Sequence, residues 1–132
     1  MATLLVIEDN ESNRILLVRR LRPQGHEVLT AADAEAGLAL ARTRQPQLIL
    51  LDVWLPGMDG WQASRLLKSD PATQHIPIII MTANAVPGDR EKALDSQCDE
   101  FETKPLNFPV LFKKIGVLLA RSPAAPPVPP AA

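Results

Sequence analysis

The stretch LILLDVWLPGMDG (48–60) decides the fold, because four apolar residues end in a carboxylate and lead into turn residues, among them Gly57 and Gly60. A short apolar run bounded in this way is typical of a strand buried on both faces of a parallel sheet. Three other runs have the same form: LLVI (4–7) before Glu8-Asp9, IIIM (78–81) before Thr82, and FET (101–103) before Lys104. Ligands bind outside the carboxyl ends of such strands, so we expect these polar side chains to converge at one edge of the sheet.

Helical stretches separate these runs and predict five β–α units. Strands are predicted at 3–8, 26–30, 47–52, 77–82 and 99–103, and helices at 12–22, 34–44, 60–69, 87–96 and 108–121. The expected helix-start residues are Asn10 or Glu11, Asp33, Pro87 and Asn107, and Gly25 follows the first helix. The apolar stripe of that helix is predicted at Ile15, Leu16, Val18 and Leu21. Alternation of strand and helix predicts an α/β fold with a parallel sheet and right-handed crossovers.

Length and composition limit the classes of protein. A chain of 132 residues, 46% hydrophobic, is the size of one domain. Its net charge of −1 argues against nucleic-acid binding as the main role. The apolar runs are far shorter than the ~20 residues that span a membrane, and the N-terminus does not resemble a signal peptide. The single cysteine, Cys98, fits a reducing compartment, so we expect a cytoplasmic protein without membrane contact.

The last eleven residues differ from the rest. Residues 122–132 hold five of the 13 prolines and are otherwise mostly alanine. Such a composition cannot bury a helix face or join a sheet. We therefore expect a folded domain over 1–121 and a disordered or polyproline-II tail over 122–132.

The polar residues at the strand ends suit a divalent cation and a phosphoryl group. Carboxylates held close together raise each other's pKa, and a bound cation relieves that repulsion. Mg²⁺ prefers oxygen ligands; those expected are Glu8, Asp9, Asp52 and the backbone carbonyl of Trp54. A carboxylate can attack phosphorus, and Asp52 is the best candidate because its strand is central. Thr82 and Lys104 would then hold phosphoryl oxygens.

Four segments together resemble the receiver domain of bacterial two-component signalling: VIEDNESNR (6–14), LILLDVWLPGMDG (48–60), IPIIIMTANA (76–85) and CDEFETKPL (98–106). The resemblance covers residues 3–120 and is greatest to stand-alone regulators and to receivers of hybrid histidine kinases. It implies a doubly wound, flavodoxin-like (βα)5 fold whose five parallel strands have the order 2-1-3-4-5.

The resemblance also implies a role for each site residue. Asp52 matches the phospho-acceptor, Thr82 the switch hydroxyl, Phe101 the aromatic switch position, and Lys104 the phosphate-contacting lysine, with a cis bond to Pro105. Glu8 and Asp9 match the acidic pair that binds Mg²⁺.

The implied partners are proteins. A histidine kinase or phosphotransfer protein would supply the phosphoryl group from a phosphohistidine, and an unknown downstream protein would receive the signal. The chain would be a monomer or weak dimer. It would not act as an enzyme on other molecules, although it could catalyse its own phosphorylation and dephosphorylation.

Three departures from the family pattern and two alternative functions remain. The tail 122–132 has no equivalent in the family. Gln97 stands where the family usually has glycine in a left-handed conformation, and Trp54 is bulky for a residue beside the site. A phosphatase that works through an aspartyl phosphate would place a second aspartate where Trp54 stands. A pseudo-receiver that binds partners without phosphorylation would lack one of the five site residues, and none is missing.

Overall fold

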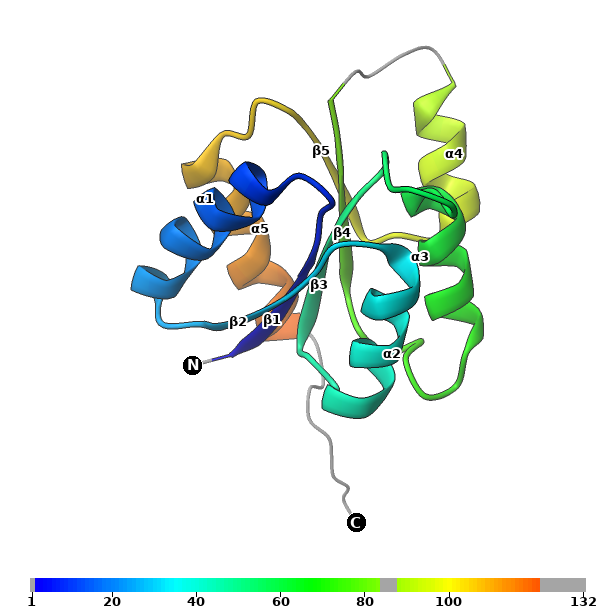
Figure 1. Cartoon of the computed structure of the whole chain (residues 1–132), viewed down its shortest axis with the longest axis horizontal. Coiled ribbons are helices and arrows are strands. Elements are labelled where there is room, and N and C mark those ends of the chain that lie inside the picture. The colour runs from blue at the N-terminus through cyan, green and yellow to red at the C-terminus, as the bar shows by residue number, and fades with distance from the viewer. Residues whose placement is uncertain (1, 84–87, 122–132) are drawn as a thin grey trace.

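A computed structural model describes residues 2–83 and 88–121 of the chain (Figure 1). The strands are β1 (Thr3–Ile7), β2 (Glu27–Ala31), β3 (Leu48–Asp52), β4 (Ile78–Thr82) and β5 (Glu100–Thr103). The helices are α1 (Glu11–Leu21), the short 3-10 helix η1 (Arg22–Gln24), α2 (Ala34–Arg44), α3 (Gly60–Ser69), α4 (Asp89–Ser96) and α5 (Phe108–Arg121). All strand pairs are parallel and the order is β2-β1-β3-β4-β5, which confirms the predicted fold class and topology.

The sheet lies between two layers of helices, with α1 and α5 on one face and α2, α3 and α4 on the other (Figure 1). Successive residues of a strand point to opposite faces, so each central strand serves two cores. In β3, Ile49 and Leu51 pack with α2 and α3, whereas Leu48 and Leu50 pack with α1 and α5. This two-sided burial explains the uninterrupted apolar runs of the sequence.

Side-chain caps begin the helices at the predicted positions. Asn10 accepts a hydrogen bond from the Asn13 amide (2.9 Å), and Asp33 accepts one from the Ala36 amide (2.8 Å). Asn107 accepts one from the Val110 amide at 3.2 Å. Each bond satisfies a donor that the first helical turn leaves free.

Left-handed residues end three of the described helical segments, η1, α2 and α4. Gln45 has φ 48° after α2. Gly25 (φ 93°) follows η1 at the end of the first helical segment, as predicted. Gln97 has φ 62° after α4, so the structure confirms that a non-glycine residue occupies a left-handed position there.

The predicted apolar stripe of α1 was partly wrong. Leu21 is buried as expected, but Leu17 is its buried neighbour one turn earlier, while Ile15 and Leu16 are 45% and 46% exposed. Leu17 and Leu21, four residues apart, lie on one face of the helix and set its contact with the sheet.

Other boundaries agree with prediction to within one or two residues, and α4 begins at Asp89 after Gly88. The expected helix-start residue Pro87 and the expected tail 122–132 lie outside the described residues. No helix in the described part of the chain combines the length and the apolar character that crossing a membrane requires.

Candidate functional site

The carboxyl ends of four strands bring the predicted polar residues together. Asp52 is the last residue of the central strand β3, and Glu8 follows the neighbouring strand β1. On the other side Thr82 ends β4 and Lys104 follows β5. The backbone amide of Lys104 donates to the carbonyl of Thr82 at 2.7 Å, so the β4–β5 pairing continues to the site itself.

Lys104 reaches back across the sheet to the carboxylates. Its Nζ donates to Oε1 of Glu8 at 2.8 Å and lies 3.2 Å from Oδ1 of Asp52. Burial lowers the pKa of Lys104, but the hydrogen bond that it donates to Glu8 and the charges of Asp52 and Glu8 outweigh this effect, so the pKa lies above its ordinary value. The bond between Lys104 and Pro105 is cis, as predicted.

Asp52 is a buried carboxylate with unused bonding capacity. It is 3% exposed, and among residues 2–83 and 88–121 no donor is hydrogen-bonded to its Oδ1, although Lys104 Nζ lies 3.2 Å away as an ion pair. Burial, followed by the charge of Glu8, raises the pKa of Asp52 to about 6, although Lys104 opposes the rise. Such a group is largely ionised at neutral pH and poorly solvated, as a reactive carboxylate must be.

Three carboxylates fit a divalent cation. Glu8, Asp9 and Asp52 each offer an oxygen within 4.8 Å of the others; Glu8 and Asp52 are buried and Asp9 is exposed. Mg²⁺ prefers oxygen ligands, of which one or a few come from carboxylates and the others from water. The Oδ1 of Asp52, to which no described donor is hydrogen-bonded, points to the same conclusion. The backbone carbonyl of Trp54 as a further ligand stays a prediction; its side chain is 62% exposed.

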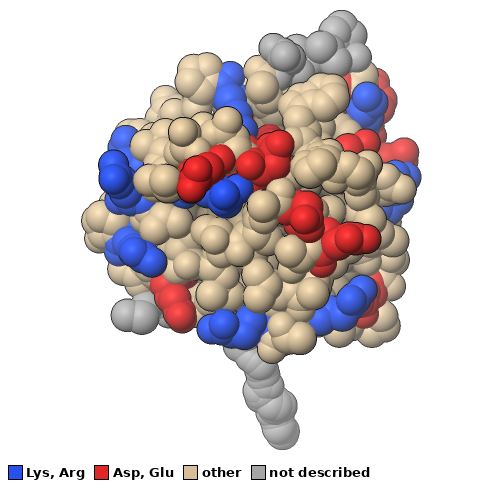
Figure 2. Space-filling view, viewed as in Figure 1, with Lys and Arg blue, Asp and Glu red and all other residues tan. Residues whose placement is uncertain are grey.

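Acidic side chains also surround the site. Figure 2 shows Asp and Glu gathered across the middle of one face, over the region where α1 and α2 begin. The first turns of these helices carry Glu11 and Glu35. A negative surface of this kind raises the local concentration of cations.

The start of α3 packs directly on the backbone of Asp52. The amide of Gly60 donates to the carbonyl of Val53 at 2.8 Å, and Asp59 caps the helix by accepting from the Gln62 amide at 2.9 Å. A Cβ on Gly60 would lie 2.8 Å from the Cα of Val53 and 2.9 Å from the carbonyl carbon of Asp52, and closer still to the Asp52 oxygen. Gly60 therefore permits the close approach of α3 to the end of β3 at Asp52.

An aromatic stack joins α3 to β5. The rings of Trp61 and Phe101 lie 5.9 Å apart between centroids at an interplanar angle of 19°. Trp61 is 7% exposed and belongs to the core, whereas Phe101 packs against that core from the partly buried edge strand. Phe101, the predicted switch residue, thus contacts the helix that begins beside Asp52.

Arg14 is a site neighbour to which the sequence analysis assigned no role. Its Nη1 donates to the carbonyl oxygens of Glu8 (2.9 Å) and Asp9 (3.0 Å). The residue belongs to a segment that carries the family resemblance, but the strand-end pattern did not point to it because it lies on α1.

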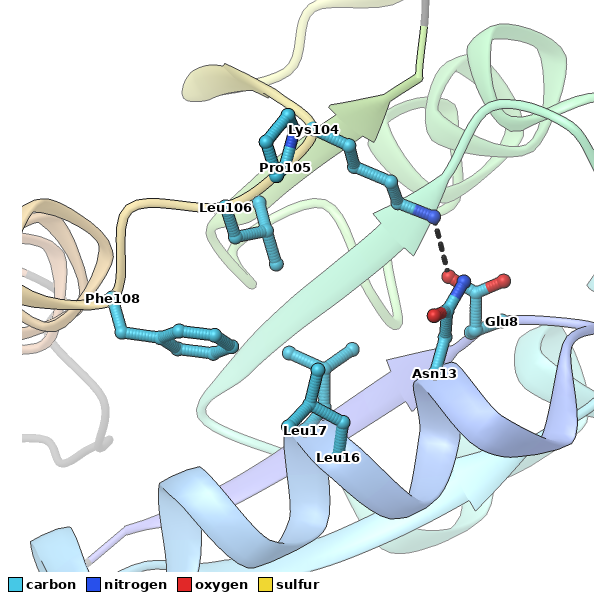
Figure 3. A pocket seen from close by; sticks show the side chains of 8 residues that line it. All are labelled: Glu8, Asn13, Leu16, Leu17, Lys104, Pro105, Leu106 and Phe108. Carbon is cyan, nitrogen blue, oxygen red and sulfur yellow. Dashed lines mark hydrogen bonds and ion pairs between the residues drawn. The ribbon is translucent and has the colours of Figure 1, made fainter.

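A groove adjoins the site between α1 and the segment that leads into α5. Figure 3 shows Leu16 and Leu17 of α1 facing Leu106 and Phe108, with the Glu8–Lys104 ion pair at one end. The groove encloses about 230 Å³. Its apolar walls therefore open onto the ion pair of Glu8 and Lys104.

The comparison with family models gives one result. The model described as response regulator receiver domain matches residues 4–116. The chain is 44% identical over 114 residues to the response regulator PleD of Caulobacter vibrioides, which covers 86% of this chain but only 25% of PleD. It is 35% identical to the protein PilH of Pseudomonas aeruginosa, covering 91% of this chain and 99% of PilH.

A solved structure has the same fold. The receiver domain of the sensor histidine kinase PA1611 from Pseudomonas aeruginosa superposes with a TM-score of 0.83 at 30% identity, over 90% of this chain and 98% of that domain. That domain holds a magnesium ion in its active site cleft.

Proposed function

This chain belongs to the response regulator receiver domain family, and on that premise we propose that it is a phosphorylatable switch whose acceptor is Asp52. The phosphoryl group comes from a phosphohistidine of a histidine kinase or phosphotransfer protein, and the signal leaves by protein contact. The observation that carries the proposal is the buried Asp52 carboxylate, whose pKa is raised to about 6 and whose Oδ1 forms an ion pair with Lys104, beside two further acids.

The reaction is a transfer between two nucleophiles. A carboxylate oxygen of Asp52 attacks phosphorus, the P–N bond to the partner's histidine breaks, and its electron pair returns to the imidazole nitrogen. Lys104, now 3.2 Å from Asp52, would exchange that contact for a phosphoryl oxygen. The hydroxyl of Thr82, at the end of the adjacent strand β4, would take a second phosphoryl oxygen.

We propose Mg²⁺ as the cofactor. Glu8, Asp9, Asp52 and the backbone carbonyl of Trp54 would hold it, together with water. When bound, the ion neutralises the clustered carboxylates and polarises a phosphoryl oxygen. The carboxylate set with ligand atoms within 4.8 Å supports this assignment.

The groove beside the site suits the phosphoryl donor. Leu16 and the partly buried Leu106 and Phe108 give it apolar walls, and Ile15 adds exposed apolar surface on α1. A helix that carries the donor histidine could bury this surface while the histidine faces Asp52.

The output would pass through the aromatic stack. Movement of Thr82 toward the phosphoryl group would change the packing of Phe101 against Trp61, because Phe101 lies on β5, the strand paired with β4. Helix α4, strand β5 and helix α5 would then present an altered surface to a downstream protein. Residues 1–121 would form the receiver domain, with 122–132 a separate Pro/Ala-rich segment, and we place the protein in the cytoplasm.

Intact mass spectrometry tests the assignment. With Mg²⁺ and a small acyl-phosphate donor the wild-type protein should gain one phosphoryl group, and Asp52→Asn should gain none. Asp59→Asn is the matched control, because Asp59 is exposed, lies in the same loop, and caps α3 through an oxygen that asparagine also offers. Equal labelling of Asp52→Asn would refute the acceptor, and absence of any labelling of wild type would favour a phosphorylation-independent adaptor.

A further inference from the structure

One basic side chain beside the site binds the backbone of the acidic loop and none of its carboxylates. A single nitrogen of Arg14, Nη1, donates to two successive carbonyl oxygens, those of Glu8 (2.9 Å) and Asp9 (3.0 Å). Bonds from a guanidinium are charge-assisted and stronger than those between neutral groups. Arg14 therefore fixes the two peptide groups that carry the acidic pair.

The choice of partner is unusual for an arginine in acidic surroundings. Lys104 pairs with the carboxylates of Glu8 and Asp52, whereas in the described part of the chain Arg14 makes no ion pair. Arg14 thus occupies none of the carboxylate oxygens of the acidic pair, and its charge is directed at their backbone carbonyl oxygens instead.

The loop is held at both sides. Asn10 donates its amide to Oε2 of Glu8 at 3.2 Å, and its side chain caps α1. The carbonyl of Asn10 accepts the amide of Arg14 at 3.0 Å, which places Arg14 one turn along the helix, above the loop. Side-chain and backbone bonds therefore close the segment from Glu8 to Arg14 into one unit.

We propose that Arg14 is a positioning residue for the cation site: it holds the backbone of Glu8 and Asp9 so that both carboxylates face Asp52 before any cation arrives. This inference rests on the proposed function. A site whose ligands are already ordered loses less conformational freedom on binding and binds more tightly. The opposing effect, repulsion between the guanidinium and the cation, is reduced by water because Arg14 is only half-buried.

The two effects have opposite signs, which makes the test decisive. Removal of charge alone would tighten cation binding, whereas loss of the backbone contacts would weaken it. Arg14→Ala removes both, and Arg14→Lys keeps the charge but loses the planar guanidinium. Arg19→Ala is the matched control, because Arg19 is an exposed residue of the same helix whose side chain makes no hydrogen bond or ion pair with the residues that the structure describes.

Titration calorimetry with Mg²⁺ should show binding about tenfold weaker for Arg14→Ala, a smaller loss for Arg14→Lys, and unchanged binding for Arg19→Ala. The Mg²⁺ concentration for half-maximal phosphorylation should rise by about the same factor, while the rate at saturating Mg²⁺ is kept. In metal-free protein, the amide of Asn10 should exchange faster in Arg14→Ala than in wild type.

Equal or tighter Mg²⁺ binding by Arg14→Ala would overturn the proposal. If Arg14→Ala does not fold, Arg14→Lys takes its place. Unchanged Mg²⁺ affinity and unchanged exchange of the Asn10 amide in Arg14→Lys would also overturn the proposal. If wild type itself binds no Mg²⁺, the proposed cofactor fails, and the positioning role of Arg14 is judged by Asn10 exchange in metal-free protein alone.

Discussion

Replacing Gly60 by alanine should damage both the fold and the site, because α3 begins against the backbone of Asp52. The added Cβ would lie 2.8 Å from the Cα of Val53 and 2.9 Å from the carbonyl carbon of Asp52, where ordinary contact begins at 3.4 Å. The atoms it meets belong to the backbone, so no side chain can rotate away. Helix α3 and the end of β3 must separate by about 0.6 Å or more.

Two magnitudes follow from this displacement. Overpacking of a close-packed interior costs about 1–3 kcal/mol of unfolding free energy. A reacting group misplaced by about 1 Å can cost about 100-fold in rate, so phosphorylation of Asp52 should slow by about tenfold or more. Both effects have one cause, the shift of the Asp52 backbone.

Urea unfolding and the rate of phosphorylation by a small donor measure the two effects. Gly116→Ala is the control, because Gly116 lies inside α5 and a Cβ there would meet no atom of the described residues within 4 Å. That variant should be stabilised by about 0.5–1 kcal/mol and phosphorylated at the wild-type rate. Wild-type stability and rate in Gly60→Ala would refute the reasoning.

Three further predictions concern stability. Because its pKa is raised to about 6, ionised Asp52 opposes folding at neutral pH, so Asp52→Asn should stabilise the metal-free protein by about 1–3 kcal/mol at pH 7. Measured by urea unfolding, this gain in stability should shrink as the pH falls from 6 toward 4, because Asp52 of the wild type then becomes protonated. A gain that does not depend on pH would show that the charge of Asp52 is not its cause. Gln97→Gly should raise the unfolding free energy by about 0.5–1 kcal/mol, whereas Gln45→Gly, which also loses side-chain hydrogen bonds to backbone carbonyls, should gain less. Trp61→Leu should lower the unfolding free energy by about 1–3 kcal/mol and speed amide exchange in β5, which carries the stacked ring of Phe101. Trp54→Leu, at an exposed position, should change the unfolding free energy by less than about 0.5 kcal/mol.

The sheet could be predicted because its strands are buried on both faces. Burial leaves an uninterrupted apolar run such as 48–51, and the parallel order then places every strand end at the same edge. The grouping of Glu8, Asp52 and Lys104 follows from that rule. Helix caps such as Asp33 were also predictable, since a single side chain accepts the hydrogen bond from a backbone amide only three residues further along the chain.

Contacts that depend on how the helices pack could not be predicted from the sequence. Four apolar residues in a row, Ile15 to Val18, fit several faces of a helix, and packing on the sheet selected Leu17. Gly60 was interpreted as a turn residue, although its necessity comes from the approach of α3 to Asp52. The bonds of Arg14 to backbone carbonyls leave no pattern of residue types at all.

The most direct test of the central claim is to locate the phosphoryl group. Borohydride reduces an aspartyl phosphate to homoserine, which peptide mass spectrometry assigns to one residue. After treatment with a small phosphodonor and Mg²⁺, homoserine should be found at position 52 and should be absent when Mg²⁺ is withheld. Reduction at Glu8 or Asp9 instead, or a phosphorylated protein in which residue 52 remains aspartate, would contradict the account.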